Sequence, residues 1–261
     1  MYQAYWGLAR SPFSAAAARA ALADSPVHAE ALARLEFLCE SRSSLGLLLG
    51  KSGSGKSAVL AQFAQRATRS GTLVSCLAAA AADEQHLLPS LADSLHVSPE
   101  GETAALWRRV ADRLAELRFD GLSAVVLLDD LDRAAGSTLA LVERLLSLPD
   151  APLTIVAAAR PESVARIGGR IVEQIALRIE LMPWSETESR DHLDRSLAAA
   201  GRVQPAFAEP AAQRLFELSG GTPRRVNQLA QLALLAGASQ RLAIIDDETI
   251  DAVHQELCAT L

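Results

Sequence analysis

The stretch Gly50-Lys51-Ser52-Gly53-Ser54-Gly55-Lys56-Ser57 decides the fold of this 261-residue chain. It fits the pattern G-x-x-x-x-G-K-[ST], follows the apolar run 45–49 and precedes an apolar helical segment that continues to about Arg69. Glycines let backbone N–H groups curl around a phosphate, and the N-terminus of the following helix adds its positive dipole. We therefore expect a phosphate-binding loop, or P-loop, between a buried strand and a helix.

Lys56 has the clearest expected role in this loop. Of the chain's 25 basic residues only two are lysines, Lys51 and Lys56, and both lie in the quoted stretch. An ammonium at Lys56 would reach the β- and γ-phosphates of ATP, and the Ser57 hydroxyl would ligate Mg2+. The alternative is a glycine turn that holds no ligand. The expected nucleotide contacts are Gly50, Ser52, Gly53, Ser54, Gly55, Lys56, Ser57 and Ala58.

Short apolar runs alternate with helical segments up to residue 181. The runs 45–49, 72–77, 124–128, 153–158 and 175–181 predict strands of a parallel sheet covered by helices on both faces. After Pro183 the strand pattern stops, and Ser185 with Glu188 forms a capping box that opens the first of several helices. We predict an α/β fold with three parts: a helical lead-in over 1–40, a P-loop core over 41–182 and an all-helical lid over 183–261.

The run 124–128 is followed by Asp129 and Asp130, at the edge of the sheet where parallel strands bind ligands. Asp129 would hold Mg2+ through water, and Asp130 would polarise the attacking water. The alternative is an acidic turn made of Asp129, Asp130 and Asp132. Arg160 follows the run 153–158 in the same way, and we expect it to be either a γ-phosphate sensor or half of a structural salt bridge.

Composition limits the classes of function. A net charge of −6 and a pI near 5.4 argue against binding to nucleic acid that is dominated by electrostatic attraction. A local arginine patch that binds nucleic acid is the alternative. Three widely spaced cysteines indicate a reducing compartment, and we therefore predict that the protein is cytoplasmic. The N-terminus does not read as a signal peptide, and no apolar run is long enough to cross a bilayer.

Several segments together resemble a known family. The P-loop, the acidic strand end and a helical module with Gly221-Thr222-Pro223-Arg224-Arg225-Val226-Asn227 look like an AAA+ ATPase. Tyr5-Trp6-Gly7-Leu8 with Pro12-Phe13, the segment 28–35 and Ser219-Gly220-Gly221-Thr222-Pro223-Arg224 are similar, more narrowly, to the general secretion pathway protein A family. That family accompanies bacterial type II secretion and related pilus systems.

The resemblance implies roles for further arginines. Arg224 would touch the nucleotide phosphates from the lid of the same subunit. Arg170 lies where AAA+ proteins place an arginine finger that completes a neighbour's site, with Arg166 as a competitor and a plain surface arginine as the alternative.

Two further residues matter for the expected site. His28 either opens a helix or lies near the adenine. The acidic strand of the family usually ends Asp-Glu, so Asp130 is a departure and turnover could be slow.

The motifs predict a Mg2+-dependent ATPase that couples nucleotide state to the remodelling or assembly of a protein partner, and the resemblance implies a secretion or pilus-related system. A finger supplied by a neighbour implies self-association into dimers or rings. One alternative is a slow nucleotide-dependent switch, which Asp130 favours. Another is a DNA-handling ATPase of the transposition type, which shares the lid signature and which the net charge of −6 disfavours. The sequence names neither the partner nor the pathway.

Overall fold

The computed structural model describes residues 2–14, 16–17, 22, 25–80 and 83–259. The chain divides into two compact units. The first unit comprises Met1–His28, Gly53–Gly55 and Met182–Leu261, and the second comprises Ala29–Ser52 and Lys56–Leu181. The lead-in predicted over residues 1–40 is thus divided after His28, and the tip of the P-loop is grouped with the first unit.

The second unit is built on the parallel sheet that the sequence predicts. Its strands are β1 (Leu45–Leu49), β2 (Leu73–Ala78), β3 (Ala124–Asp129), β4 (Leu153–Ala159) and β5 (Leu177–Glu180). All pairings are parallel, in the order β2-β3-β4-β1-β5. Every residue of β4 is buried, because β4 lies in the middle of the sheet between β3 and β1. The carboxyl ends of β1, β3 and β4 therefore share one edge of the sheet.

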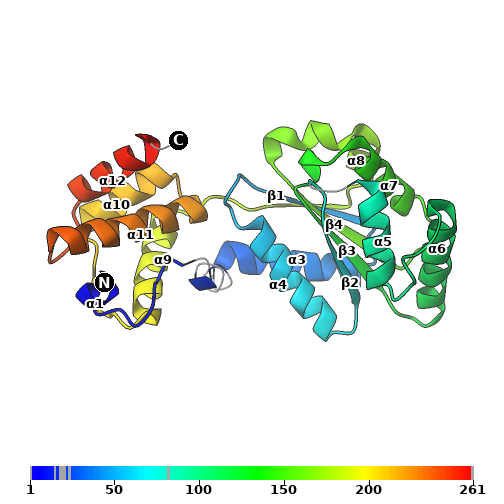
Figure 1. The fold of residues 1–261 in the computed structure, drawn as a ribbon, viewed down its shortest axis with the longest axis horizontal. Helices are drawn as coiled ribbons and strands as arrows, with labels where there is room; N and C mark the ends of the chain where they lie inside the picture. The colour runs from blue at the N-terminus through cyan, green and yellow to red at the C-terminus, as the bar shows by residue number, and fades with distance from the viewer. Residues whose placement is uncertain (1, 15, 18–21, 23–24, 81–82, 260–261) are drawn as a thin grey trace. The chain divides into compact units, whose positions relative to one another are not determined.

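Helices cover the sheet on both faces, as predicted (Figure 1). In chain order they are α3 (Pro26–Glu40), α4 (Lys56–Arg69), α5 (Glu84–Ser94), α6 (Thr103–Phe119), η1 (Leu131–Arg133), α7 (Gly136–Leu146), η2 (Pro161–Ile167) and α8 (Gly169–Glu173). The η elements are single stretches of 3-10 helix.

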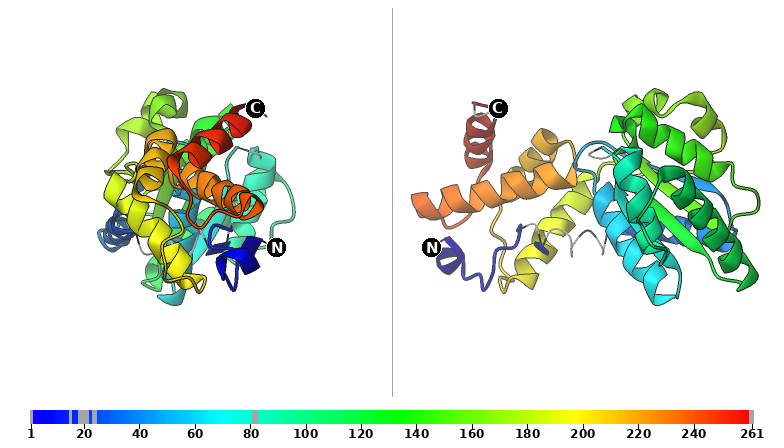
Figure 2. Two further views of the ribbon diagram at one scale, coloured as in Figure 1. Left: turned by 90° about the vertical axis from the view of Figure 1, so that its left-hand side faces the viewer. Right: turned by 45° about the vertical axis from the view of Figure 1, so that its right-hand side comes forward.

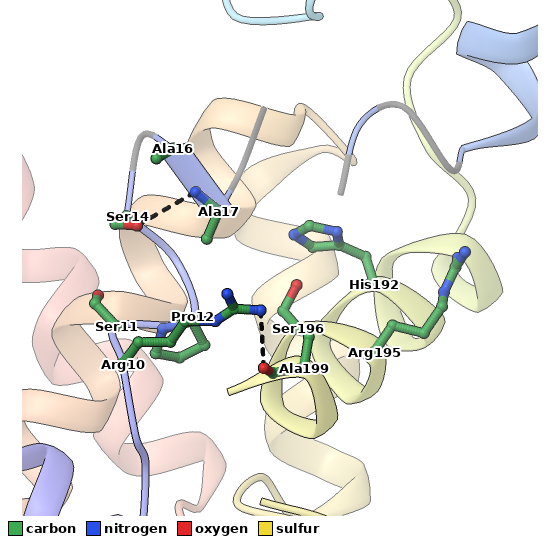
Figure 3. Close-up of a pocket in the computed structure, with 10 residues that line it drawn as sticks. All are labelled: Arg10, Ser11, Pro12, Ser14, Ala16, Ala17, His192, Arg195, Ser196 and Ala199. Atoms are coloured by element: carbon green, nitrogen blue, oxygen red, sulfur yellow. Dashed lines mark hydrogen bonds between the residues drawn. The ribbon is translucent and has the colours of Figure 1, made fainter. Parts of the chain in front are cut away.

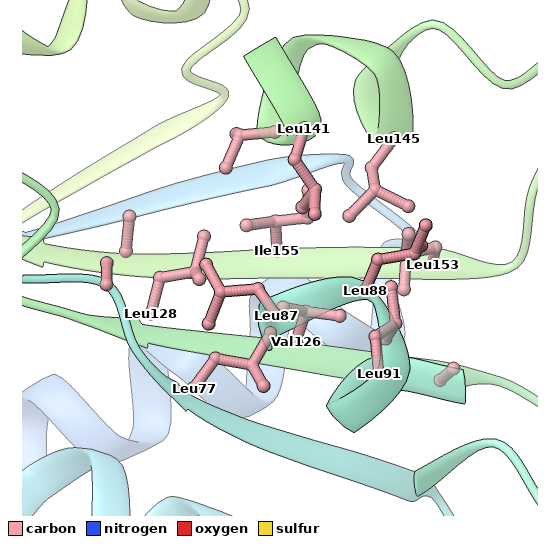
Figure 4. Close-up of a cluster of buried hydrophobic side chains, with 14 of the residues drawn as sticks. Leu77, Leu87, Leu88, Leu91, Val126, Leu128, Leu141, Leu145, Leu153 and Ile155 are labelled. Atoms are coloured by element: carbon pink, nitrogen blue, oxygen red, sulfur yellow. The ribbon is translucent and has the colours of Figure 1, made fainter. Parts of the chain in front are cut away.

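The core of this unit follows from the alternation of side chains along each strand. Leu45 and Leu47 of β1 belong to a large cluster with Val126, Leu128 and Ile155 and with leucines of α5 and α7 (Figure 4). Gly46 points to the other face, where an added Cβ would meet Leu38 of α3. The absence of a side chain at residue 46 lets α3 pack closely against β1.

The first unit is helical. It contains α1 (Tyr2–Trp6), α9 (Glu186–Ala199), α10 (Glu209–Ser219), α11 (Pro223–Gln240) and α12 (Asp247–Ala259). Helices α9 to α12 pack on one another, and α1 packs on α11 (Figure 2). The buried Trp6 fixes α1 by donating from Nε1 to Leu234 O at 2.8 Å. The predicted capping box is present: Ser185 Oγ accepts from Glu188 N–H, and the Glu188 side chain accepts from Ser185 N–H.

Within the described ranges, no helix combines the length and the apolar character needed to cross a bilayer.

Candidate functional site

The predicted P-loop lies between β1 and α4. Strand β1 ends at Leu49 and α4 begins at Lys56, so residues 50–55 form the connection. Gly53 and Gly55 have φ of +83° and +104°, conformations that residues with a Cβ rarely adopt. The glycines of the motif are therefore required by the backbone itself.

The N–H groups of this loop are available as donors. Among the described residues, none of the backbone N–H groups of residues 51–55 donates to another backbone oxygen. Ser54 is nevertheless buried, and Gly53 and Gly55 are half-buried. Because buried N–H groups are almost always paired, this run of free donors ahead of the N-terminus of α4 fits an anionic ligand. The residues present thus match the chemistry of a nucleotide phosphate.

Lys56 is buried at the start of α4. Its Nζ donates to Gly50 O at 2.8 Å and to Lys51 O at 3.2 Å, so the ammonium lies over the backbone of its own loop. Burial lowers the pKa of Lys56, and the carboxylates that follow β3 act in the opposite direction. A desolvated ammonium gains from an additional anion nearby, as expected for a phosphate-binding lysine.

Two consecutive carbonyl groups at the tip of the loop are held by residues outside it. Arg224 N–H, at the start of α11, donates to Gly53 O at 3.2 Å. His28 Nε2, in the first turn of α3, lies 3.0 Å from Ser54 O. His28 therefore does open a helix, but its side chain contacts the P-loop backbone. Sequence reasoning missed this contact because nothing near His28 in the sequence identifies Ser54 as its partner.

Asp129 and Asp130 lie at the carboxyl end of β3, as predicted. Both are partly exposed, and Asp129 Oδ1 accepts from Asp130 N–H at 3.0 Å. Asp130 has a left-handed backbone with φ of 53° and ψ of 43°, which turns the chain sharply into η1. Two carboxylates thus stay accessible at the edge of the sheet where β1 passes into the P-loop.

Asp132 and Arg160 form an ion pair. Arg160 Nε donates to Asp132 Oδ2 at 2.8 Å, and the Asp132 side chain is completely buried. The Asp132 carboxylate raises the pKa of Arg160. Of the two expectations for Arg160, the structure contains the salt bridge; a γ-phosphate sensor stays a hypothesis. Asp132 Oδ1 has no hydrogen-bond partner among the described residues.

The other predicted arginines differ in exposure and contacts. Arg170 lies on α8 with 85% of its side chain exposed, and its Nη1 is 3.9 Å from Glu143 Oε2. Arg166, in η2, is also exposed. Arg224 lies in the first turn of α11, and its backbone contacts Gly53 as described above. An exposed arginine is what a finger acting on a neighbour requires.

The proposed metal ligands are consistent with a site completed by phosphate. Ser57 is exposed in the first turn of α4. In the described ranges, no group of three or more His, Cys, Asp or Glu side chains is arranged to hold a metal by itself. A Mg2+ ion at Ser57 and Asp129 would therefore need oxygen ligands from the nucleotide and from water.

A separate cavity of about 460 Å³ lies within the first unit, between residues 10–14, 16 and 17 on one side and α9 on the other (Figure 3). Arg10 lines the cavity and donates from Nη2 to Ala199 O at 2.9 Å. Ser196 is buried beside it, and its Oγ has no hydrogen-bond partner among the described residues. None of the residues predicted to bind nucleotide lines this cavity.

Comparisons with known proteins agree with the motifs. Residues 39–167 match the family model described as an AAA domain. General secretion pathway protein A of Aeromonas hydrophila is 29% identical over 245 residues, which are 90% of this chain and 45% of the relative. The chain thus spans less than half the length of that relative.

Solved structures with the same fold include proteins from three organisms. Aeropyrum pernix ORC1, solved in complex with DNA, has a TM-score of 0.62 at 20% identity, over 92% of this chain and 69% of that one. Pyrobaculum aerophilum CDC6P has a TM-score of 0.63 at 17% identity, over 88% and 67%. The Thermotoga maritima RUVB Holliday junction branch migration motor has a TM-score of 0.59 at 16% identity, over 88% and 68%. The chain therefore shares the fold of these solved structures, matches an AAA domain over residues 39–167 and is similar in sequence to general secretion pathway protein A.

Proposed function

We propose that this protein binds ATP with Mg2+ through residues 50–58 and hydrolyses it, and that the nucleotide state controls a protein partner. The observation that carries the proposal is the run of free N–H donors at residues 51–55, immediately before the buried ammonium of Lys56. Backbone donors, a helix N-terminus and a desolvated cation are together suited to a polyphosphate. The similarity to general secretion pathway protein A supports the choice of ATP and of a secretion or pilus-related partner.

The residues would divide the work as follows. Lys56 and the loop amides would bind the β- and γ-phosphates, and Ser57 with Asp129 would hold the Mg2+ that neutralises their charge. Asp130 would orient a water for in-line attack on the γ-phosphorus, so that the bond to the bridging oxygen breaks and ADP and phosphate leave. Arg224 would contact the phosphates from α11, and Arg160 would do so only after leaving Asp132.

Self-association is part of the proposal. Arg170 would complete the site of a neighbouring subunit, and its high exposure on α8 supports this role. The three cysteines, Cys39, Cys76 and Cys258, are all free, which supports a reducing compartment such as the cytoplasm.

Binding is the first test, and the chain offers a matched control. Lys56→Ala should weaken ATP binding roughly 10- to 100-fold, because it removes hydrogen bonds to a charged group. Lys51→Ala removes the same charge from an exposed lysine of the same loop and should change binding little. Isothermal titration with ATP measures both. Equal effects of the two variants would contradict a specific role of Lys56.

Turnover is the second test. ATP hydrolysis per subunit should rise with protein concentration, and Arg170→Ala should abolish the rise while leaving ATP binding intact. Arg166→Ala is the control for a nearby exposed arginine. A turnover independent of concentration would reject the finger.

A slow nucleotide switch is the second candidate function. The observation that favours it is Asp130, one methylene shorter than the glutamate usual at this position. Tight ATP binding with turnover near the uncatalysed rate at all protein concentrations would support the switch.

A further inference from the structure

The P-loop tip is held at two adjacent carbonyl groups by residues of the first unit, to which the tip itself belongs. Gly53 O accepts from the backbone N–H of Arg224 at 3.2 Å, and Ser54 O lies 3.0 Å from His28 Nε2. The first contact uses the main chain and is independent of the side chain at residue 224. The second depends entirely on the side chain at residue 28.

Holding a carbonyl group also orients the N–H group of the next residue. In a trans peptide the C=O and the following N–H point in opposite directions, and the described chain has no cis peptide bond. The contact at Ser54 O therefore directs Gly55 N–H away from His28. Gly55 N–H is one of the donors that pair with no other backbone oxygen of the described residues. Its direction is consequently set by the histidine.

The imidazole of His28 is itself closely confined. His28 is only 2% exposed, and its Nε2 occupies the space that a Cβ on Gly55 would need. A carbonyl oxygen can only accept, so Nε2 must carry a hydrogen. Nδ1 is buried and has no partner among the described residues, so a second hydrogen there would lack an acceptor. Burial also lowers the pKa of His28. The side chain is therefore the neutral Nε2–H tautomer.

We propose that His28 is a positioning residue for phosphate binding: its Nε2–H fixes the Ser54–Gly55 peptide so that Gly55 N–H already points at the β-phosphate. The histidine acts through Ser54 and contacts neither the base nor the phosphate. This inference rests on the proposed function. It explains why a buried polar side chain with one unpartnered nitrogen lies against a glycine loop, where an apolar side chain would pack without that cost.

Three substitutions separate hydrogen bonding from packing. In His28→Gln the amide Nε2 lies the same number of bonds from the backbone as the histidine Nε2 and can donate to Ser54 O. In His28→Asn the amide is one bond short, and in His28→Leu the volume is kept without a donor. ADP affinity, measured by titration, should fall roughly 10- to 100-fold for the leucine and asparagine variants, and it should stay within about threefold of the original for glutamine.

Inorganic tripolyphosphate distinguishes this role from a contact with adenine. Its affinity, measured by competition with a fluorescent ATP analogue, should fall in His28→Leu by the same factor as that of ADP. Loss of ADP affinity with unchanged tripolyphosphate affinity would overturn the proposal in favour of a base contact.

The remaining outcomes are also decisive. If all three variants bound ADP as tightly as the original chain, the positioning role would be overturned and the nucleotide site would remain intact. If the leucine and glutamine variants lost affinity equally and lost thermal stability equally, His28 would be a structural residue only. No ADP or ATP binding by the unmodified chain would instead contradict the proposed function itself.

Discussion

Replacing Gly221 by alanine should destabilise the first unit far more than replacing its neighbour Gly220. Both glycines are left-handed, with φ of +66° and +56°. A Cβ added at Gly220 would meet nothing within 4 Å, whereas one added at Gly221 would overlap the carbonyl oxygen of Trp184 and lie 3.0 Å from its carbonyl carbon. Both positions therefore require a positive φ angle, and they differ in the space available for a Cβ atom.

The size of the difference can be worked out term by term. A left-handed alanine costs about 1 to 2 kcal/mol, and loss of glycine's freedom in the unfolded chain returns about 0.4 to 1 kcal/mol. Gly220→Ala should therefore cost about 1 kcal/mol. Gly221→Ala adds about 1 to 3 kcal/mol for overpacking and up to about 1 kcal/mol for strain in the hydrogen bond from Trp184 N–H to Gly221 O. Trp184 cannot easily yield, because its ring packs on His192 at 4.6 Å between centroids.

Urea unfolding followed by circular dichroism measures both variants, with the m-value as the check that the same transition is being compared. Gly221→Ala should lose about 1 to 4 kcal/mol more than Gly220→Ala. Equal losses would refute the reasoning, since they would mean that the Trp184 backbone moves aside without cost. A smaller loss for Gly221→Ala than for Gly220→Ala would place Trp184 elsewhere.

Three further predictions concern charged and titrating groups. Burial lowers the pKa of His192 below its ordinary 6.5, so the unfolded chain binds a proton that the folded chain rejects, and stability falls as the pH drops below 6.5. His192→Phe should flatten that decline in urea unfolding. Arg160→Ala should lower the unfolding free energy more than Arg170→Ala, because it leaves the buried Asp132 carboxylate without its cation, and adding Asp132→Asn should restore part of the loss. Asp130→Glu should raise ATP turnover while lowering stability by about 1 kcal/mol, because glutamate tolerates the left-handed backbone less well; unchanged turnover would show that side-chain length there does not limit hydrolysis.

Much of the fold could be predicted because its signals are local. The strand runs are largely apolar over five to seven residues and are separated by helical patterns, so the sequence predicts each strand to within two residues of its observed bounds. The capping box at Ser185 and Glu188 is contained in four residues and forms as written. The glycine pattern of the P-loop predicts a tight loop between a strand and a helix, and residues 50–55 form that connection between β1 and α4.

The contacts that refine the site could not be predicted because they join distant residues. His28 and Ser54 are 26 residues apart, and Asp132 and Arg160 are 28 apart. Residue type alone left two roles open for His28 and for Arg160, because a histidine or an arginine can serve in many settings. Only the fold decides which polar group each side chain reaches, since a buried polar group must be paired with whatever the topology brings beside it.

In the acidic stretch at the end of β3, the backbone conformation of one residue determines which carboxylates are buried and which are exposed. Asp130 adopts the left-handed region, which aspartate tolerates better than most residues. That turn starts η1 and places Asp132 inside the fold, where it pairs with Arg160, while Asp129 and Asp130 stay partly exposed. The shorter carboxylate at residue 130 therefore has a conformational reason. A glutamate there would reach further toward a bound nucleotide but would strain the turn that secures the ion pair between Asp132 and Arg160. Under the proposed function, the same residue would therefore set both the rate of hydrolysis and the stability of the site.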